Sequence, residues 1–227
     1  MADSLLPGGL PEGLPGALPA AEPRRPRNAE ATRKRLLDAA EREFARTGFA
    51  GARLRDIADA AGVQPALIHH YFADKDGLYR AVLDRGLLQT SAMSWELLAG
   101  RSDVEGLVRG FVELLVDFHA QHEHLLAILR HEAAAGGQMA APLIAQRSLP
   151  VVNAVAALIE ARQRAGEVRA DVDAREIIVA AMAMAVYPFS DAAMLLPVLP
   201  GAAPREGEAL ARRKDAIVKL LLAGMRA

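Results

Sequence analysis

The stretch from Leu54 to Tyr79 constrains the fold of this chain more than any other segment. It begins with a short helical pattern whose apolar residues recur at the i, i+3, i+4, i+7 spacing of one buried face: Leu54, Ile57, Ala58 and Ala61. Gly62 follows at the position where a helix needs a left-handed C-terminal cap. Pro65 then opens a second short helix at its first position, where the missing N–H leaves no hydrogen bond unmade. Two short helices joined by a tight turn that contains glycine predict a helix-turn-helix unit.

The second of these helices, residues 65–71, is predicted to expose a polar surface. Ile68 and Phe72 stand four residues apart and are expected to face the core. The residues expected to face outward are Gln64, Pro65, Ala66, His69, His70 and Tyr71. Such side chains fit the DNA major groove, because glutamine pairs with adenine edges, alanine meets a thymine methyl, and histidine and tyrosine donate to phosphates. Lys75 begins the next helix, where its ammonium group and free backbone N–H groups can hold a phosphate together.

In its order and spacing this segment resembles the DNA-binding domain of the TetR family of bacterial transcriptional regulators. The matching residues span about a fifth of the chain and are Thr32, Arg33, Leu37, Ala39, Ala40, Phe44, Gly48, Phe49, Ile57, Ala58, Ala61, Gly62, Val63, His70, Tyr71, Phe72, Lys75 and Leu78. The chain departs from the family at Gln64, where a small hydroxyl residue is usual, and at Ala66, where glycine is usual. His69 replaces the usual tyrosine that touches phosphate. These departures leave the base preference open.

The residues predicted to contact DNA extend on both sides of the helix-turn-helix. Thr32 and Arg33, near the start of the first helix, are expected to contact phosphates. The basic arm of Arg24, Arg25 and Arg27 either follows the DNA backbone or minor groove or is a solubilising flank, and the sequence leaves both interpretations open. The predicted DNA-binding residues are Arg27, Thr32, Arg33, Arg53, Arg55, Gln64, Pro65, Ala66, His69, His70, Tyr71 and Lys75.

The distribution of charge favours DNA binding by one end of the chain, although the net charge is −1. Residues 24–85 hold 13 Lys and Arg against 9 Asp and Glu, a surplus of +4. The remainder holds 14 against 19, a deficit of −5. Basic charge therefore collects around the predicted DNA contacts, where phosphate binding needs it.

Composition favours an all-α fold in a reducing compartment. Aromatic residues make up 4% of the chain and alanine is abundant, which favours helices over strands. The sequence has no cysteine, so disulfides and thiolate metal sites are excluded and the cytoplasm is the expected location. The longest apolar run, Ile177 to Tyr187, has eleven residues, about half the length that spans a bilayer, so no membrane span is expected.

Three regions are predicted along the chain. Residues 1–23 carry a proline every four residues and are expected to form a disordered Pro/Gly-rich tail; a proline-rich ligand for a partner domain is the alternative. Residues 24–74 are the predicted helix-turn-helix DNA-binding domain, with a first helix from about Asn28 that ends at Gly48. Residues 75–227 are the predicted effector-binding and dimerisation domain. Its helices are expected at residues 75–100, 103–120, 122–135, 140–165, 173–196 and 206–226.

The histidines of the second domain suggest a metal site at first sight. His122 falls on the helical face of Phe118 and Leu125, whereas His119 and His124 diverge from that face. Ligands that diverge do not converge on one ion, so these histidines are expected in a pocket wall, in the core or on the surface. The sequence also lacks a Ser/His/Asp elbow, a phosphate-binding glycine loop and paired carboxylates on one helical face. No enzyme activity, metal or cofactor is therefore predicted.

Bulky side chains are few in this alanine-rich domain and are expected to border an unfilled apolar space. Residues of this kind at helical spacing belong more often to a core, and that alternative applies to each of them singly. An apolar cavity with a few polar groups is the usual form of a small-molecule site. The predicted ligand-binding residues are Trp95, Phe111, Phe118, His119, His122, Met139, Met182 and Tyr187.

The last two helical segments are expected to build a homodimer as a four-helix bundle, the arrangement that the family resemblance implies. The predicted contact stripes are Ile177, Ile178, Ala181, Met184 and Ala185 in the first segment and Ile217, Val218, Leu221 and Leu222 in the second. The alternative is that both stripes pack within one subunit. A two-fold dimer would read the two half-sites of a palindrome.

Together these patterns predict an all-α, two-domain, TetR-like regulator: a repressor that a small apolar or amphipathic effector releases from a palindromic operator in double-stranded DNA. Effector binding is expected to move the helix at residues 75–100 and to change the separation of the two DNA-binding units. Two rivals stay open. One is a DNA-binding protein whose second domain is only a dimer scaffold, which a filled interior would favour. The other is a helical enzyme or adaptor, which failure to bind any duplex at low salt would favour.

Overall fold

The computed structural model describes residues 26–100 and 103–227, and this part of the chain is helical without a strand. The predictions for the tail at residues 1–23, for Arg24 and Arg25, and for the side chain of Arg27 lie outside the described residues. The helices are α1 (Pro26–Gly51), α2 (Leu54–Ala61), α3 (Ala66–Phe72), α4 (Lys75–Gly100), α5 (Val104–Gln121), α6 (Glu123–Ala134), α7 (Ala140–Arg164), α8 (Ala174–Ser190), α9 (Ala192–Leu195) and α10 (Gly207–Met225).

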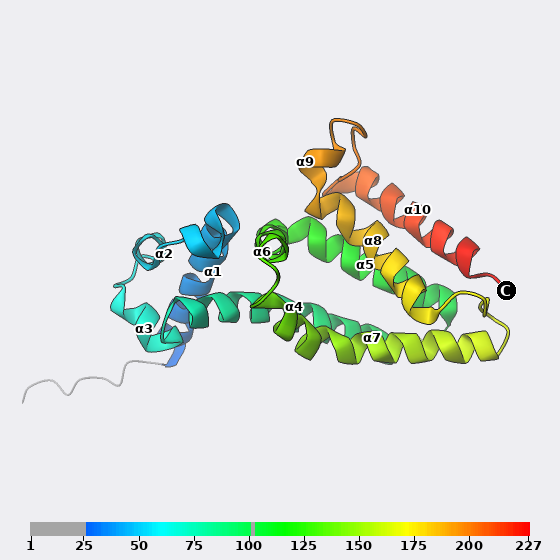
Figure 1. The fold of residues 1–227 in the computed structure, drawn as a ribbon, viewed down its shortest axis with the longest axis horizontal. Coiled ribbons are helices and arrows are strands. Elements are labelled where there is room, and N and C mark those ends of the chain that lie inside the picture. The colour runs from blue at the N-terminus through cyan, green and yellow to red at the C-terminus, as the bar shows by residue number, and fades with distance from the viewer. Residues whose placement is uncertain (1–25, 101–102) are drawn as a thin grey trace, which may run out of the picture.

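Helices α1, α2 and α3 form the head, which lies at one end of the molecule in Figure 1. The predicted helix-turn-helix is present, because α2 ends at Gly62 in the left-handed conformation, with φ 64° and ψ 43°. The Gly62 N–H donates to the Asp59 carbonyl and the Val63 N–H to the Ala58 carbonyl, which satisfies two carbonyls at the end of α2. Ile68 of α3 is fully buried, as its spacing predicts.

Helix α1 is longer than the sequence predicts and is interrupted at Gly48. This residue has φ 67° and ψ 176°, so the helix breaks there as expected, and a further turn then carries it to Gly51. A Cβ at Gly48 would stand 3.4 Å from Nδ1 of His131 on α6. That distance is an ordinary van der Waals contact, so glycine is favoured at this position for its backbone conformation rather than for the approach of α6.

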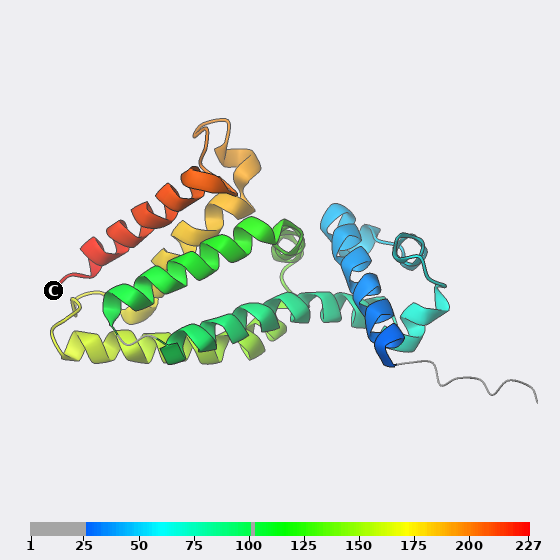
Figure 2. The ribbon, with the colours of Figure 1, turned by 180° about the vertical axis from the view of Figure 1, so that it is seen from behind.

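The remaining helices form a second body that α4 connects to the head (Figures 1 and 2). Helix α4 lies beside α7, and α5 packs against α8 and α10. The core of the head continues into this body, since Leu125 and Ile128 of α6 and Ala140 of α7 belong to the same buried cluster as Phe44 of α1. A second buried cluster joins α5, α8 and α10. The head and the body thus share apolar core across α1 and α6.

The predicted helix at residues 173–196 is divided in two. Helix α8 ends at Ser190, and the single turn of α9 follows at Ala192–Leu195. Asp191 separates them with φ −117° and ψ 26°, outside helical geometry, and its N–H still donates to the Tyr187 carbonyl. Two prolines fall inside helices, Pro150 in α7 and Pro188 in α8. No break in the helix assignment occurs at either residue.

The predicted dimer stripes are corrected by the structure. Ala185 of α8 and Ile217, Val218 and Leu221 of α10 are buried in one subunit's core, because both helices turn these faces towards α5. Three other stripe residues, Ala181, Met184 and Leu222, pack against the same core. Ile178 lines a cavity. The alternative stated from the sequence, packing within one subunit, is therefore the one observed for these residues.

Helix α7 is the one described helix long and apolar enough to cross a membrane by length and composition. Polar residues interrupt its apolar ones, so no long unbroken apolar run marks this helix in the sequence. In the most apolar 18-residue stretch of this helix, 11% is buried. Many of its apolar side chains border a cavity in the second body, which accounts for their exposure.

Candidate DNA-binding head and ligand cavity

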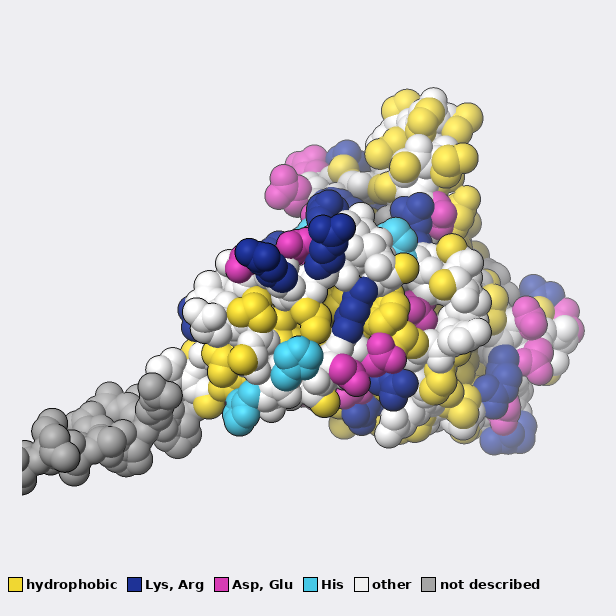
Figure 3. Space-filling view, turned by 60° about the vertical axis from the view of Figure 1, so that its left-hand side comes forward, with side chains coloured by type: hydrophobic (Ala, Val, Ile, Leu, Met, Phe, Trp, Pro, Cys, Tyr) yellow, Lys and Arg dark blue, Asp and Glu magenta, His cyan; other side chains and the backbone are white. Residues whose placement is uncertain are grey.

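The outer face of α3 is exposed and varied in chemistry. Gln64, Pro65 and Ala66 at its start are exposed, and so are His69 and His70 in its last turn. Figure 3 views this end of the molecule and shows histidine, lysine and arginine side chains exposed among apolar ones. Nδ1 of His69 lies 2.8 Å from the Ala73 carbonyl and donates to it, so Nε2 of the neutral ring is left as an acceptor. The sequence prediction for these five residues agrees with their exposure.

Two of the predicted contacts are less accessible than the sequence suggests. Thr32 is buried, and its hydroxyl oxygen accepts a hydrogen bond from the Arg35 guanidinium at 3.4 Å. Tyr71 is half-buried and packs against the core of the head, because it stands three residues after Ile68 on the flank of the buried face. The outward orientation predicted for Tyr71 is therefore wrong in part.

The basic residues of the head surround α3. The Arg33 guanidinium lies 5.3 Å from the centre of the Phe72 ring, a cation–π contact that links α1 to α3. Arg53 and Arg55 are exposed at the start of α2. The Lys75 ammonium lies 4.7 Å from the centre of the Phe49 ring and donates to the Ala50 carbonyl at 3.4 Å. Lys75 thus stands between the end of α1 and the start of α4, still partly exposed.

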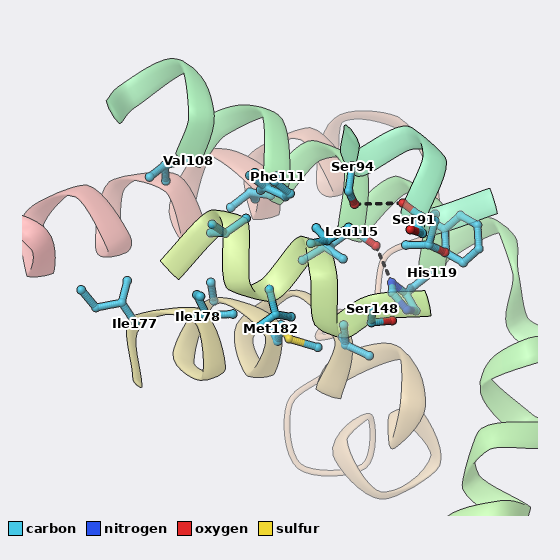
Figure 4. Close-up of a pocket in the computed structure, with 18 of the residues that line it drawn as sticks. Ser91, Ser94, Val108, Phe111, Leu115, His119, Ser148, Ile177, Ile178 and Met182 are labelled. Carbon is cyan, nitrogen blue, oxygen red and sulfur yellow. Dashed lines mark hydrogen bonds between the residues drawn. The ribbon is translucent and has the colours of Figure 1, made fainter. Parts of the chain in front are cut away.

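A cavity of about 800 Å³ lies in the second body, lined by α4, α5, α6, α7, α8 and α10 and partly open to solvent (Figure 4). Aliphatic side chains dominate its lining, and α7 alone contributes Ile144, Val151, Val152, Val155, Leu158 and Ile159. This volume is typical of sites for drug-sized ligands. The interior is therefore not filled by the subunit's own side chains.

Four of the eight predicted ligand-binding residues line the cavity: Phe111, Phe118, His119 and Met182. The other four do not line it, so their prediction as ligand-binding residues is corrected. Trp95 and Tyr187 are on outer faces of their helices, with 45% and 51% of their surfaces exposed. Met139 packs against the core of the head. His122 stacks on the Phe118 ring, with 3.9 Å between the two ring centres, and does not line the cavity.

Polar groups of the lining were mostly missed by the sequence analysis. Ser91 and Ser94 of α4 and Ser148 of α7 line the cavity, and single serines in helices carry no signal of the space that they face. His119 of α5 is the predicted polar residue that does line it. Its Nδ1 lies 2.7 Å from the Leu115 carbonyl. Burial lowers the pKa of His119, the hydrogen bond to Leu115 opposes this change, and the charge of His122 adds to it.

A buried polar junction links the head to the cavity-bearing body. The Tyr79 hydroxyl of α4 donates to Oε1 of Glu132 at 2.9 Å. The other carboxylate oxygen accepts from the backbone N–H groups of Met139 and Ala140, at 3.2 and 3.0 Å. Glu132 thereby caps the start of α7, where a negative charge is favoured. Burial, reinforced by the bond to Glu132, raises the pKa of Tyr79 above its usual value.

Helix α4 is also tied by ion pairs on both sides. Arg147 of α7 binds Asp84 through two hydrogen bonds, of 2.7 and 3.0 Å. Arg85 binds Asp38 and Glu41 of α1. Among the residues that the structure describes, no group of three His, Asp or Glu could hold a metal ion. The candidate sites are thus a polar exposed helix in the head and an apolar cavity, joined by α4.

Comparison with known proteins agrees with this arrangement. Residues 36–82 match the family model described as "Bacterial regulatory proteins, tetR family", and residues 105–221 match "Tetracyclin repressor-like, C-terminal domain". The chain is 33% identical over 159 residues to the HTH-type transcriptional repressor SCO4008 of Streptomyces coelicolor, covering 70% of this chain and 79% of that protein. It is 29% identical over 150 residues to the repressor NicS of Pseudomonas putida, covering 65% and 71%.

Solved structures show the same fold at lower identity. The ketosteroid transcriptional regulator KstR2 of Mycobacterium tuberculosis superimposes with a TM-score of 0.67 at 18% identity, covering 86% of this chain and 95% of that one. The fatty acid degradation regulator FadR of Bacillus halodurans gives a TM-score of 0.65 at 19% identity, covering 85% and 99%. At this identity the likeness concerns the fold alone.

Proposed function

The chain belongs to the TetR family of bacterial regulatory proteins and is a DNA-binding transcriptional regulator, and we propose that it is a cytoplasmic repressor released from a palindromic operator by a small molecule bound in the cavity. Its named relatives are transcriptional regulators, and no catalytic role is proposed.

The observation that carries release by a ligand is the double role of α4. Its first half supplies core to the head through Leu78, Tyr79, Val82 and Leu83. Its second half lines the cavity through Leu87, Thr90, Ser91 and Ser94. One continuous helix therefore contributes both to the core of the head and to the wall of the cavity. The rival without a ligand does not account for an unfilled cavity of about 800 Å³.

A close contact gives a second route from the cavity to α4. Leu125 of α6 lines the cavity and also nests against Gly86 of α4, where an added Cβ would stand 2.5 Å from its Cδ2. A ligand that displaces Leu125 would therefore shift α4. To act, the ligand must bind one arrangement of α4 better than the other, and couplings of this kind amount to about 1–3 kcal/mol.

The proposed dimer uses the faces of α8 and α10 that the subunit leaves exposed. On α8 these are small or apolar residues at helical spacing: Val179, Ala180, Ala183 and Tyr187. On α10 they are Ala216, Leu220 and Ala223. Two such helices from each subunit would make a four-helix bundle. A two-fold dimer places two α3 helices about one turn of DNA apart, roughly 34 Å, as a palindrome requires.

In the head we propose that Gln64, Ala66 and His70 contact base edges, while Arg33 and Lys75 contact phosphates. This division follows exposure and chemistry: the first three lie on the outer face of α3, and the two cations flank it. Arg53 and Arg55, at the start of α2, would contact the neighbouring backbone. The hydroxyl of Thr32 would need to exchange its Arg35 partner for a phosphate oxygen.

Selection of binding sites from random duplexes tests this function. Purified protein is expected to enrich a palindrome and to bind it as a dimer, with an affinity that falls steeply as salt concentration rises. A collection of duplexes with no enriched sequence, bound weakly and alike, would contradict the proposal of a sequence-specific regulator.

Replacing Lys75 with alanine is expected to weaken binding to every duplex alike, because a phosphate contact carries no sequence information. The slope of log affinity against log salt concentration should become shallower by about one per subunit. The control is Arg164→Ala, which removes a positive charge from the exposed far end of α7. A loss of affinity confined to one sequence, with an unchanged salt slope, would contradict the role assigned to Lys75.

A further inference from the structure

We propose that the cavity selects an uncharged, elongated hydrophobe that carries a hydroxyl or another hydrogen-bond donor at one end, and that Nε2 of His119 accepts from this donor. This inference rests on the proposed function and specifies the class of effector that the cavity takes.

The wall of the cavity is polarised along its length. Figure 4 shows Ser91, Ser94, His119 and Ser148 together at one end, with Val108 and Ile177 at the other. The polar end is the one nearer the head, because His119 lies in the last turn of α5 and α5 runs towards the head (Figure 1). A ligand with one polar end and a long apolar remainder matches this division.

The hydrogen bond of His119 fixes which ring nitrogen meets the ligand. A backbone carbonyl only accepts, so the 2.7 Å contact with Leu115 places the proton on Nδ1. Nε2 of the neutral ring then holds a lone pair and has no hydrogen-bond partner among the described residues. The lowered pKa of His119 keeps the ring in this neutral form at neutral pH. His119 therefore offers the cavity an acceptor.

Two hydroxyl groups of α4 also donate their protons to backbone carbonyls, as Nδ1 of His119 does. The Thr90 hydroxyl donates to the Gly86 carbonyl at 3.0 Å, and the Ser94 hydroxyl donates to the Thr90 carbonyl at 2.9 Å. Each proton is donated to the helix backbone, so each oxygen can only accept a further hydrogen bond. Together with Nε2 of His119, these two oxygens give the lining three groups that can only accept, and a ligand group that donates can satisfy them.

Two of the charged residues that line the cavity already have partners of their own. Arg162 binds Glu167 at 3.0 Å, and Asp191 accepts from Ser190 at 2.5 Å. Arg130 also lines the cavity, and its side chain is exposed. A carboxylate placed against His119 would face lone pairs in an apolar space, which penalises its charge.

Three probes of equal chain length test the inference: 1-dodecanol, 1-methoxydodecane and dodecanoate, each measured by displacement of Nile red from the full-length protein without DNA. We expect 1-dodecanol to bind about tenfold more tightly than 1-methoxydodecane, since the ether cannot donate and leaves the acceptors unpaired. Dodecanoate is expected to bind more weakly than the alcohol at neutral pH. Equal binding of alcohol and ether, tighter binding of dodecanoate, or no binding of any probe would overturn the inference.

Replacing His119 with phenylalanine keeps a flat ring and removes the acceptor. The tenfold preference for 1-dodecanol over the ether is expected to fall to near one, with the affinity for the ether unchanged. His119→Gln, which retains an acceptor, should keep part of the preference and covers the case in which the phenylalanine variant does not fold. The control His124→Phe replaces an exposed histidine outside the lining and should change neither affinity. A preference that persists in His119→Phe would contradict the role of Nε2.

These measurements are independent of the release of DNA. If 1-dodecanol binds with the expected preference and leaves affinity for the selected palindrome unchanged, the class of ligand stands and the proposed release fails. If the protein instead releases the palindrome with dodecanoate alone, the release stands and the class of ligand is wrong.

Discussion

Replacing Ala66 with glutamate is expected to weaken binding to the selected palindrome by at least about a hundredfold. Ala66 is exposed at the first position of α3, so the new carboxylate would enter the major groove between two rows of phosphates. Like charges brought together at an interface cost several kcal/mol, and about 2.8 kcal/mol corresponds to a hundredfold change in Kd. Fluorescence anisotropy of a labelled duplex at fixed salt concentration measures the effect.

Stability should not fall in this variant, because a negative charge in the first turn of a helix is favoured. The matched control is Ala157→Glu, which adds the same charge at an exposed position of α7 and is expected to leave DNA binding within a few fold of the original. Binding of Ala66→Glu that equals the control would mean that α3 is not the helix that enters the groove.

Replacing Glu132 with alanine is expected to lower the free energy of unfolding by about 3–5 kcal/mol, the usual cost of breaking a buried, charge-assisted network. Glu132 is 6% exposed and accepts from three donors: the Tyr79 hydroxyl and the backbone N–H groups of Met139 and Ala140. Alanine would leave the buried Tyr79 hydroxyl and Ala140 N–H, and the half-buried Met139 N–H, without this acceptor. Urea unfolding at one fixed protein concentration measures the change, since the stability of a dimer depends on concentration.

Two further variants divide this effect. Tyr79→Phe removes one donor and its hydrogen bond to Glu132, and it should lower the free energy of unfolding by about 1–2 kcal/mol. Once Glu132 is alanine, the Tyr79 hydroxyl has no acceptor to lose, so adding Tyr79→Phe should cost less than it does alone. A Glu132→Ala variant within about 1 kcal/mol of the original protein would show that the junction between α4, α6 and α7 is not a stabilising network.

The head is the part of the fold that local sequence predicts well. Its turn depends on Gly62 and Pro65, whose backbone preferences act within a few residues, so their positions identify the helix-turn-helix without knowledge of the rest of the molecule. Burial of Ile68 and Phe72 follows from the same short-range periodicity. Tyr71 was assigned wrongly in part because it lies on the boundary between the two faces of α3, where periodicity does not decide.

The second body was predicted less completely because several helices compete for each apolar face. Periodicity identified the stripe of Ala185 and its neighbours on α8, but not whether α5 or a second subunit would cover it. Trp95 was assigned to the pocket for its size, although its position on α4 turns it outward. The lining serines gave no signal at all, because a serine within a helix has the same local sequence whether it faces a cavity or water. His119 was identified because four of the six histidines of the chain fall at residues 119–131, as polar residues in an apolar domain.

The coupling of the cavity to the head through α4 is tested most directly by the distance between the two heads of a dimer. The chain has no cysteine, so Ala60→Cys, at an exposed position of α2, provides a single spin-label site per subunit. Pulsed electron resonance then compares the distance distribution with and without 1-dodecanol at a concentration that displaces all Nile red. The proposed function predicts that 1-dodecanol shifts the distance distribution between the two labels, because the two heads change their separation, and that affinity for the palindrome falls with it. A filled cavity with an unchanged distribution and unchanged affinity would contradict the coupling.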